Sequence, residues 1–164
     1  MKVATIDDIR RGGFVGEIAI AALQKSECRG VPKQPGVYLV LRPDAGPPNF
    51  LPEGTGGHLK GKDPNVEVGC LKNKWVEGAI VLYIGKTGPK TATLRSRLRQ
   101  YMQFGQRKRV GHWGGRYIWQ LRNSSDLLVC WKAIENLPPR NAERALIAQF
   151  RQAYDKPPFA NIKS

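Results

Sequence analysis

The stretch AIVLYIGKTG, residues 79–88, decides how the rest of the chain is interpreted. Its apolar residues predict a β-strand over 79–85, which runs directly into Lys86 and Thr87. A strand followed by Gly-Lys-Thr suggests the phosphate-binding loop of a nucleotide-binding protein, whose pattern is G-x-x-x-x-G-K-[ST]. A strand that ends in Tyr-Ile-Gly suggests instead a tyrosine at the edge of a sheet. The two interpretations predict different chemistry.

The nucleotide-binding interpretation fails at one position. The first glycine of the pattern should stand at position 80, where the chain has Ile80 inside the predicted strand. Without that glycine the loop cannot turn its backbone amides around a phosphate. A second near match over 56–63 has the right spacing, but Asp63 replaces the hydroxyl residue that should hold Mg²⁺. We therefore expect a flexible basic loop at 56–62 and reject a nucleoside triphosphatase.

The distribution of charge indicates a polyanionic partner. The 164 residues include 27 Lys and Arg against 13 Asp and Glu, which gives a formal net charge of +14. Between Gly78 and Ser125 there is no acidic residue, and the basic residues of that stretch are Lys86, Lys90, Arg95, Arg97, Arg99, Arg107, Lys108, Arg109, Arg116 and Arg122. A surface of one sign gathers counterions that a polyanion displaces favourably. Nucleic acid is the expected polyanion, and a merely soluble basic surface is the alternative.

Cysteine usage and hydropathy favour a cytoplasmic protein. The three cysteines form no C-x-x-C pair, which supports neither a disulfide framework nor a thiolate zinc site. No apolar run approaches the roughly 20 residues that span a bilayer. Charges at 1–13 stand where a signal peptide needs an apolar stretch. We therefore expect no membrane association.

Hydrophobic periodicity predicts an α+β domain with a small sheet flanked by helices. A helix that starts at Thr5 is interrupted at Gly12 and belongs, with the next helix, to a helical extension over 1–30 packed on a core over 31–164. The expected strands span 36–42, 79–85 and 127–134, and the expected helices 14–25, 91–102 and 138–154. Residues 43–78, rich in Gly and Pro, form a long insertion between the first two strands, with local strand near 66–68 and 75–76. Another loop follows at 105–116, and Tyr117 and Trp119 alternate with Ile118 as in a strand.

Two tyrosines are expected to meet if the first two strands pair antiparallel. Tyr38 lies at the start of one strand and Tyr83 at the end of the next. Dense positive charge nearby would lower the pKa of a phenol and favour the phenolate, which could act as a base. Alternatively, a neutral phenol could pass on a proton while it hydrogen-bonds a water.

The predicted helix 91–102 supplies cations for the same place. Arg97 and Tyr101 lie together on the flank of its apolar stripe, so Arg97 is expected to point inward and clamp a phosphate. Arg95 and Arg99 are turned more towards solvent, where they either contact nucleic acid or form an ordinary solvated face. The apolar stripe itself consists of Leu94, Leu98 and Met102.

The last helix and the 105–116 loop each offer one further candidate. Glu143 lies at the margin of an apolar face, where a carboxylate needs a partner. That partner is Mg²⁺, or Mn²⁺, or else a salt bridge to Arg144 or Arg140 or a capping contact. His112, close to Arg116 in a Gly-rich stretch, is either a general base or a loop histidine that hydrogen-bonds its surroundings.

In this order the residues resemble the GIY-YIG endonucleases. The resemblance covers most of the chain, from about 35 to 162, and rests on Gly36-Val37-Tyr38, Tyr83-Ile84-Gly85, Lys86, Leu94, Arg97, Tyr101, Glu143 and Asn161. It implies a three-stranded antiparallel sheet flanked by helices. It also implies Tyr38 as base or proton relay, Arg97 and Tyr83 around the phosphate, and Glu143 as the protein ligand of one divalent metal. Asn161 is implied to be structural or to contact the site.

The function expected from this resemblance is a divalent-metal-dependent DNA endonuclease that hydrolyses phosphodiester bonds by attack of an activated water. Tyr38, Tyr83, Arg97, Glu143 and His112 are the candidate catalytic residues, and the candidate substrate-binding residues are Lys86, Arg95, Arg99, Tyr101, Arg116 and Asn161. A non-catalytic nucleic-acid-binding module on the same fold is the alternative, and an RNA-associated protein is a third. A symmetric double-strand cutter would often be a homodimer. The long gap between the two tyrosine motifs departs from the family pattern.

Overall fold

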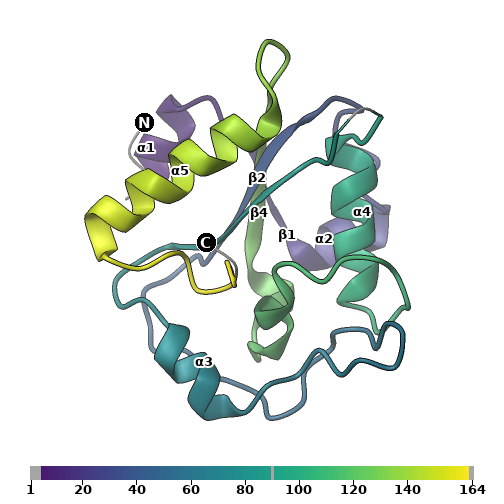
Figure 1. Cartoon of the computed structure of the whole chain (residues 1–164), viewed down its shortest axis with the longest axis vertical. Helices are drawn as coiled ribbons and strands as arrows, with labels where there is room; N and C mark the ends of the chain where they lie inside the picture. The colour runs from purple at the N-terminus through teal and green to yellow at the C-terminus, as the bar shows by residue number, and fades with distance from the viewer. Residues whose placement is uncertain (1–4, 90, 163–164) are drawn as a thin grey trace.

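The computed structural model describes residues 5–89 and 91–162 and has an α+β architecture (Figure 1). Residues 1–4, 90 and 163–164 lie outside this description. The strands form one antiparallel sheet in the order β1-β4-β2-β3. They span Val15–Ala19 (β1), Gly36–Leu41 (β2), Val81–Lys86 (β3) and Leu128–Ala133 (β4). The helices are α1 (Ile6–Arg11), α2 (Ile20–Ser26), α3 (Val68–Lys74), α4 (Leu94–Phe104) and α5 (Pro139–Tyr154), with 3₁₀ turns η1 (Arg116–Gln120) and η2 (Ser124–Asp126).

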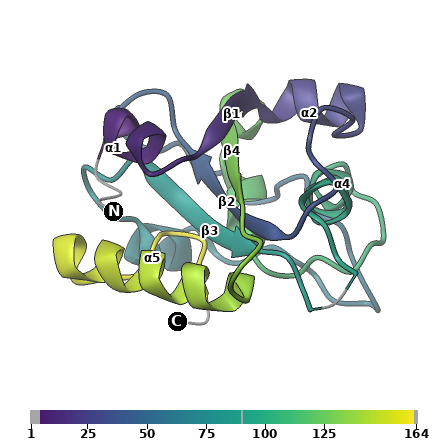
Figure 2. The same cartoon turned by 90° about the horizontal axis from the view of Figure 1, so that it is seen from above.

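Helices cover both faces of the sheet. In Figures 1 and 2, α1 and α5 lie on one side and α2 and α4 on the other. Every residue of β2 is buried, which explains why this strand has no polar alternation. Its odd positions Val37 and Leu39 pack in a cluster with α5, whereas Tyr38 and Val40 pack in a second cluster with α4. The tyrosine therefore faces α4.

The N-terminal segment corrects the sequence prediction. The helix expected over 14–25 is instead the edge strand β1 followed by the short helix α2, so the sheet has four strands and not three. Gly16 has φ +107° and Glu17 has φ 53°, values that an α-helix does not contain. The ring of Trp131 on β4 lies against Gly16, where a Cβ would overlap it. Pairing with β4 over a long sequence distance thus overrides local helical periodicity.

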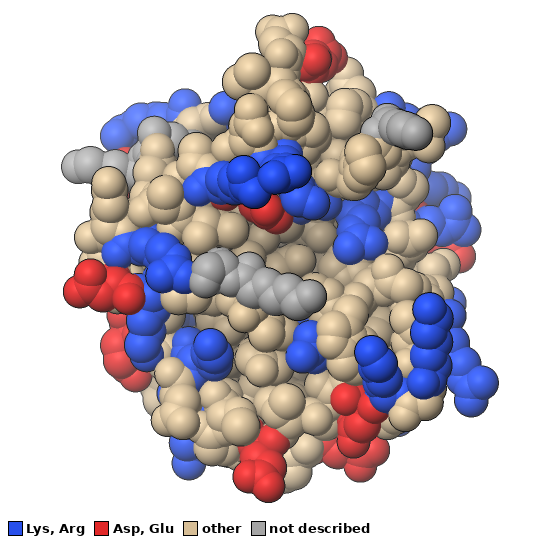
Figure 3. All heavy atoms as spheres, viewed as in Figure 1, with Lys and Arg blue, Asp and Glu red and all other residues tan. Residues whose placement is uncertain are grey.

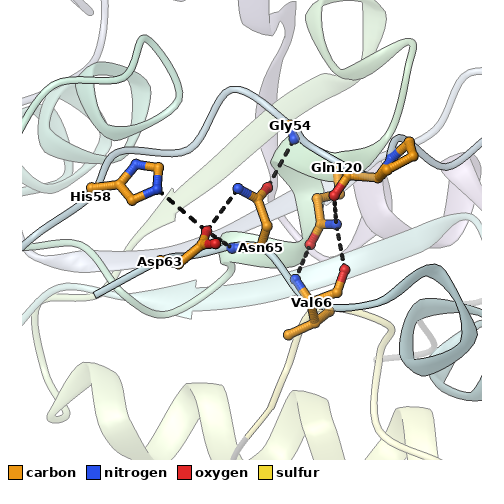
Figure 4. A network of polar contacts seen from close by, with 7 residues as sticks. Gly54, His58, Asp63, Asn65, Val66 and Gln120 are labelled. Atoms are coloured by element: carbon orange, nitrogen blue, oxygen red, sulfur yellow. Dashed lines mark hydrogen bonds and ion pairs between the residues drawn. The ribbon is translucent and has the colours of Figure 1, made fainter. Parts of the chain in front are cut away.

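The insertion is an ordered segment attached to η1. Gln120 is buried, accepts a hydrogen bond from the Val66 amide at 2.9 Å and donates to the Val66 carbonyl at 2.8 Å (Figure 4). Beside it, Asn65 accepts from the Gly54 amide at 2.8 Å, and Asp63 accepts from the Asn65 amide at 2.9 Å. These contacts replace strand pairing as the source of order in the insertion.

Two local predictions about strand structure are wrong. The segments 66–68 and 75–76, where short strands were expected, contain no strand, and the helix α3 lies between them from Val68 to Lys74. Residues 117–119 lie in η1, a 3₁₀ turn, rather than in a strand. Trp75 and Val76, like Tyr117 and Trp119, are buried, so the burial of these residues was predictable while the backbone conformation was not. The near match to a phosphate-binding loop forms a tight turn, in which Lys60 and Gly61 have positive φ and the Lys62 amide donates to the Leu59 carbonyl.

Candidate active site

The two tyrosines of the sequence motifs meet on the α4 face of the sheet. Antiparallel pairing places Tyr38 opposite Gly85 and Tyr83 opposite Val40. Because opposed residues and residues two apart in a strand share a face, both rings lie on the same face of the sheet. Their ring centroids are 6.0 Å apart at an interplanar angle of 63°. The antiparallel arrangement expected from the sequence is therefore present.

Glycines make room for this aromatic cluster. A Cβ on Gly85 would overlap the ring and the hydroxyl of Tyr38, so the strand can pass under the phenol only with glycine at this position. Gly115 has φ +75°, and a Cβ there would lie 2.6 Å from the hydroxyl oxygen of Tyr101. The glycine of the YIG motif and a glycine of the 105–116 loop thus serve the packing of the same cluster.

His112 joins the cluster from the loop. Its Nε2 lies 3.1 Å from the hydroxyl oxygen of Tyr38, and its ring stacks on Tyr101 with centroids 4.2 Å apart. Burial, together with the positive charge of Arg97, lowers the pKa of His112 to about 3, so the imidazole is neutral at pH 7. The other ring nitrogen, Nδ1, is buried and meets no partner in good hydrogen-bond geometry among the described residues.

Burial also sets the state of the phenols, and it corrects the expectation of a phenolate. Burial raises the pKa of Tyr38 well above its ordinary value, and it raises the pKa of Tyr83 to about 12. Arg97 acts in the opposite direction on both but is outweighed. Both side chains therefore keep their protons at neutral pH, and of the two roles considered only the proton relay agrees with this environment.

Arg97 points towards the cluster, as the helical spacing predicts. This half-buried side chain on α4 donates from one guanidinium nitrogen to the Gly111 carbonyl at 3.3 Å and to the Gln100 side chain at 3.4 Å. The α4 cap at Thr93 fixes the start of the helix with a capping box. A cation is thereby held where the buried cluster opens to solvent.

Glu143 approaches from the other side of the sheet, on the first half of α5. Burial raises the pKa of this half-buried carboxyl, while the charges of Lys86 and Arg144 oppose the shift. Within the described parts of the chain no ion pair includes Glu143, and it does not cap its helix. The expected alternatives of a salt bridge or a capping contact are therefore not observed.

Two grooves meet at Lys86, the last residue of β3. One, of about 570 Å³, follows α5 and is lined by Lys86, Arg140, Glu143, Arg144, Ile147, Ala148 and Arg151. The other, of about 580 Å³, follows the start of α4 and is lined by Lys86, Gly88, Pro89, Thr91, Ala92, Ser96, Arg97 and Gln100. Figure 3 shows basic side chains gathered on this face of the molecule, with acidic atoms among them. Lys86 thus lies between Glu143 and Arg97.

Three arginines expected to bind substrate have other contacts. Arg95 donates from Nε to the Val31 carbonyl at 2.7 Å, and Arg99 lies 3.8 Å from Glu27, so both are turned towards the segment after α2. Arg116 stacks on Trp113, with its guanidinium carbon 4.4 Å from the ring centroid. All three lie outside the two grooves.

The polar groups of Asn161 and Tyr101 are buried and form hydrogen bonds within the fold. The Asn161 side chain donates to the Ile84 carbonyl and accepts from the Ile84 amide, both at 2.9 Å. Because β3 is one of the two edge strands of the sheet, the side-chain amide of Asn161 takes the place of a neighbouring strand. Tyr101 is buried and donates its hydroxyl proton to the Gly115 carbonyl at 2.7 Å. The polar groups of both side chains are thus used within the fold.

Thr87 completes the correction of the nucleotide-binding interpretation. Its buried hydroxyl accepts a hydrogen bond from the Gly36 amide at 3.2 Å, and its own amide donates to the Gly36 carbonyl at 3.0 Å. The threonine that would bind a metal in a phosphate-binding loop here extends the pairing of β2 with β3.

The arginines of α5 were missed as functional candidates, because the sequence analysis considered Arg140 and Arg144 only as partners of Glu143. A signal was present. Arg140, Arg144 and Arg151 have the spacing i, i+4, i+11, which places them on one face of a helix.

Comparisons with known proteins found no match, so the function has to be inferred from the site itself. No family model matches the chain, no curated protein matches it, and no solved structure matches it. Over residues 5–89 and 91–162, no group of three or more His, Cys, Asp and Glu side chains could hold a metal ion. No helix in that same range is long and apolar enough to cross a membrane. What the fold and site define is an α+β protein with a Tyr-Tyr-His cluster beside a basic groove that contains one carboxylate.

Proposed function

We propose that the protein is a divalent-metal-dependent DNA endonuclease of the GIY-YIG type. In this proposal β4, β2 and β3 are the three-stranded core of that fold, and β1 is an added edge strand. The observation that carries the proposal is the convergence at Lys86. Lys86 lines both grooves, one with Arg97 and the other with Glu143, and the charges of Arg97 and Glu143 both act on the pKa of Tyr83.

The cations of the groove would bind and orient the phosphodiester. Arg97 offers a planar guanidinium for a phosphate, and Lys86 offers a point charge between the two grooves. Held in place by Gly111 and Gln100, Arg97 needs little reorganisation as charge grows in the transition state.

The tyrosines and His112 would move the proton of the attacking water. Tyr83 is 8% exposed, whereas Tyr38 and His112 are 0% exposed. Of these three side chains, Tyr83 is therefore the one that a water can reach. The water gives its proton to the Tyr83 oxygen, Tyr83 passes its own to Tyr38, and Tyr38 passes its own to Nε2 of the neutral His112. Burial keeps both phenols protonated at rest, as this relay requires, but it opposes the imidazolium at the end of the relay, because it lowers the pKa of His112 to about 3.

Glu143 would hold the metal. A half-buried carboxyl with no ion pair among the described residues suits a hard cation such as Mg²⁺ or Mn²⁺, which takes oxygen ligands and keeps several waters. Since Lys86 and Arg144 are its neighbours, the cation fits best when substrate phosphate shares the groove. When bound, it supplies Lewis-acid stabilisation of the phosphate and of the leaving oxygen.

Cleavage assays on duplex, nicked, branched and single-stranded DNA with Mg²⁺ or Mn²⁺ test the proposal. Glu143→Gln should abolish metal-dependent cleavage while it leaves binding to DNA in place, because the substitution keeps the shape and removes the charge. Full cleavage by Glu143→Gln would falsify the assignment of the metal ligand. DNA duplexes with two cleavage sites in opposite orientations test for the homodimer that is expected of a symmetric double-strand cutter.

A non-catalytic nucleic-acid-binding module is the second candidate, and one observation favours it. Tyr38 and His112 are completely buried, and the pKa of each is shifted by burial in the direction that keeps the group neutral. This candidate predicts salt-dependent binding and no cleavage with either divalent cation. A competition between RNA and DNA of the same sequence separates an RNA-associated protein from both.

A further inference from the structure

The groove along α5 has a composition that the nuclease chemistry alone does not require. Four cations line it, namely Lys86, Arg140, Arg144 and Arg151, against the single carboxyl of Glu143. Its apolar lining residues are Ile147 and Ala148. One or two cations would suffice beside a scissile phosphate, so the remaining arginines call for a separate ligand.

The arginines form a straight line along the helix. At about 100° per residue, Arg140, Arg144 and Arg151 fall within about 40° of one another on the helix circumference. At about 1.5 Å of rise per residue, the line from Arg140 to Arg151 is about 16 Å long. Along the axis of duplex DNA, where each strand has one phosphate for about 3.4 Å, this length corresponds to about five nucleotides of one strand.

Arg140 and Arg144 are exposed, and the one carboxyl that lines the groove with them, that of Glu143, forms no ion pair with either among the described residues. Arg10 pairs with Glu17 at 2.8 Å, and Arg99 lies 3.8 Å from Glu27. In the described ranges, by contrast, no ion pair includes Arg140 or Arg144. A surface whose cations are not neutralised within the chain gains most from a polyanion, because binding then releases counterions.

We propose that this face of α5 binds consecutive phosphates of a single DNA strand and leads that strand past Glu143 to Lys86. The inference rests on the proposed function for its direction, since Lys86 also borders the groove that contains Arg97. Guanidinium groups suit the task because they bind phosphate oxygens in pairs. Figure 3 shows that basic side chains continue over this part of the surface.

The test is binding of a fluorescent single-stranded oligonucleotide in EDTA, measured by anisotropy over a series of salt concentrations. The variant is Arg140→Gln/Arg144→Gln. Its matched control is Lys72→Gln/Lys74→Gln, which removes the same charge from exposed positions on α3, outside both grooves. We expect the slope of log Kobs against log salt to fall by about 1.4 in the α5 variant, at about 0.7 for each lost phosphate contact. The Kd should rise roughly tenfold at moderate salt, and the control should keep the wild-type slope.

Three outcomes overturn the inference: an unchanged slope in the α5 variant, an equal fall in variant and control, or a wild-type protein that does not bind the oligonucleotide. Circular dichroism shows whether each variant remains folded. A second variant, Arg144→Lys, keeps the charge and should keep the slope. The proposed nuclease fails separately: if the wild-type protein binds with the expected slope but never cleaves, the strand-binding face stands and the endonuclease does not.

Discussion

The aromatic cluster under α4 and the groove along α5 lie at the same end of the sheet, but the polar groups of the cluster are buried and those of the groove are mostly exposed. In the cluster, Tyr38, Tyr101 and His112 are completely buried. Burial raises the pKa of the two tyrosines and lowers the pKa of His112, so each side chain is kept neutral. In the groove, arginines remain exposed around the half-buried Glu143. The comparison teaches that proximity of charge does not by itself set a pKa: Arg97 acts on the phenols, but the loss of water outweighs it.

Arg97 lies at the boundary between the two regions, and its removal should have the largest effect. If the proposed function holds, Arg97→Gln lowers the cleavage rate by about 10²–10³-fold, the range typical for loss of one preorganised transition-state donor. Single-turnover cleavage with Mg²⁺ measures it. Arg99→Gln, on the same helix but turned towards Glu27, is the control and should cleave at close to the wild-type rate. Equal losses in both variants contradict a special role for Arg97.

Gly85→Ala should break the aromatic cluster by sterics alone. The added Cβ overlaps the Tyr38 ring, so the strand or the ring must shift, at a cost of about 1–3 kcal/mol in the free energy of unfolding. Urea unfolding followed by circular dichroism measures the change. The matched control is Gly88→Ala, whose Cβ would meet its nearest neighbour at an ordinary 3.8 Å. A stable Gly85→Ala protein shows that the cluster is looser than its contacts indicate.

His112 should make the buried cluster sensitive to acid. Its pKa is about 3 in the folded protein and 6.5 ordinarily, so between these values the unfolded chain binds the extra proton and stability is lost as the pH falls. The loss is about 1.4 kcal/mol for each pH unit below 6.5. Urea midpoints at pH 7.0 and 5.5 measure it, and His112→Gln, which has no titrating ring, should show a smaller difference. Identical differences in the two proteins contradict the neutral buried imidazole.

Thr87→Val sharpens the distinction from a nucleotide-binding loop. Loss of the hydroxyl leaves the buried Gly36 amide without that acceptor and costs about 1–3 kcal/mol at most, less if the amide finds another partner. Thr87→Ser keeps the oxygen and should be close to wild type in a thermal melt. If the proposed function holds, the metal dependence of cleavage is the same in Thr87→Val, because this hydroxyl holds no metal.

The parts of the site that were predictable are those set by local periodicity. The positions of Tyr38 at the start of one strand and Tyr83 at the end of the next bring the two residues together once the strands pair antiparallel, and the apolar stripe of α4 turns Arg97 inward. The margin position of Glu143 on α5 follows from the same helical spacing. In each case a period of two or of 3.6 residues carries the information, so few neighbouring residues suffice.

The remaining features depend on contacts that no local pattern contains. The sequence alone determined the two tyrosine strands, the inward arginine and the excess of positive charge. Only the tertiary structure decided that 15–19 is a strand, because its partner is β4, more than a hundred residues away. Only it decided that the phenols are neutral, because the loop that contains His112 covers them, and burial is a property of the folded surroundings rather than of the residue.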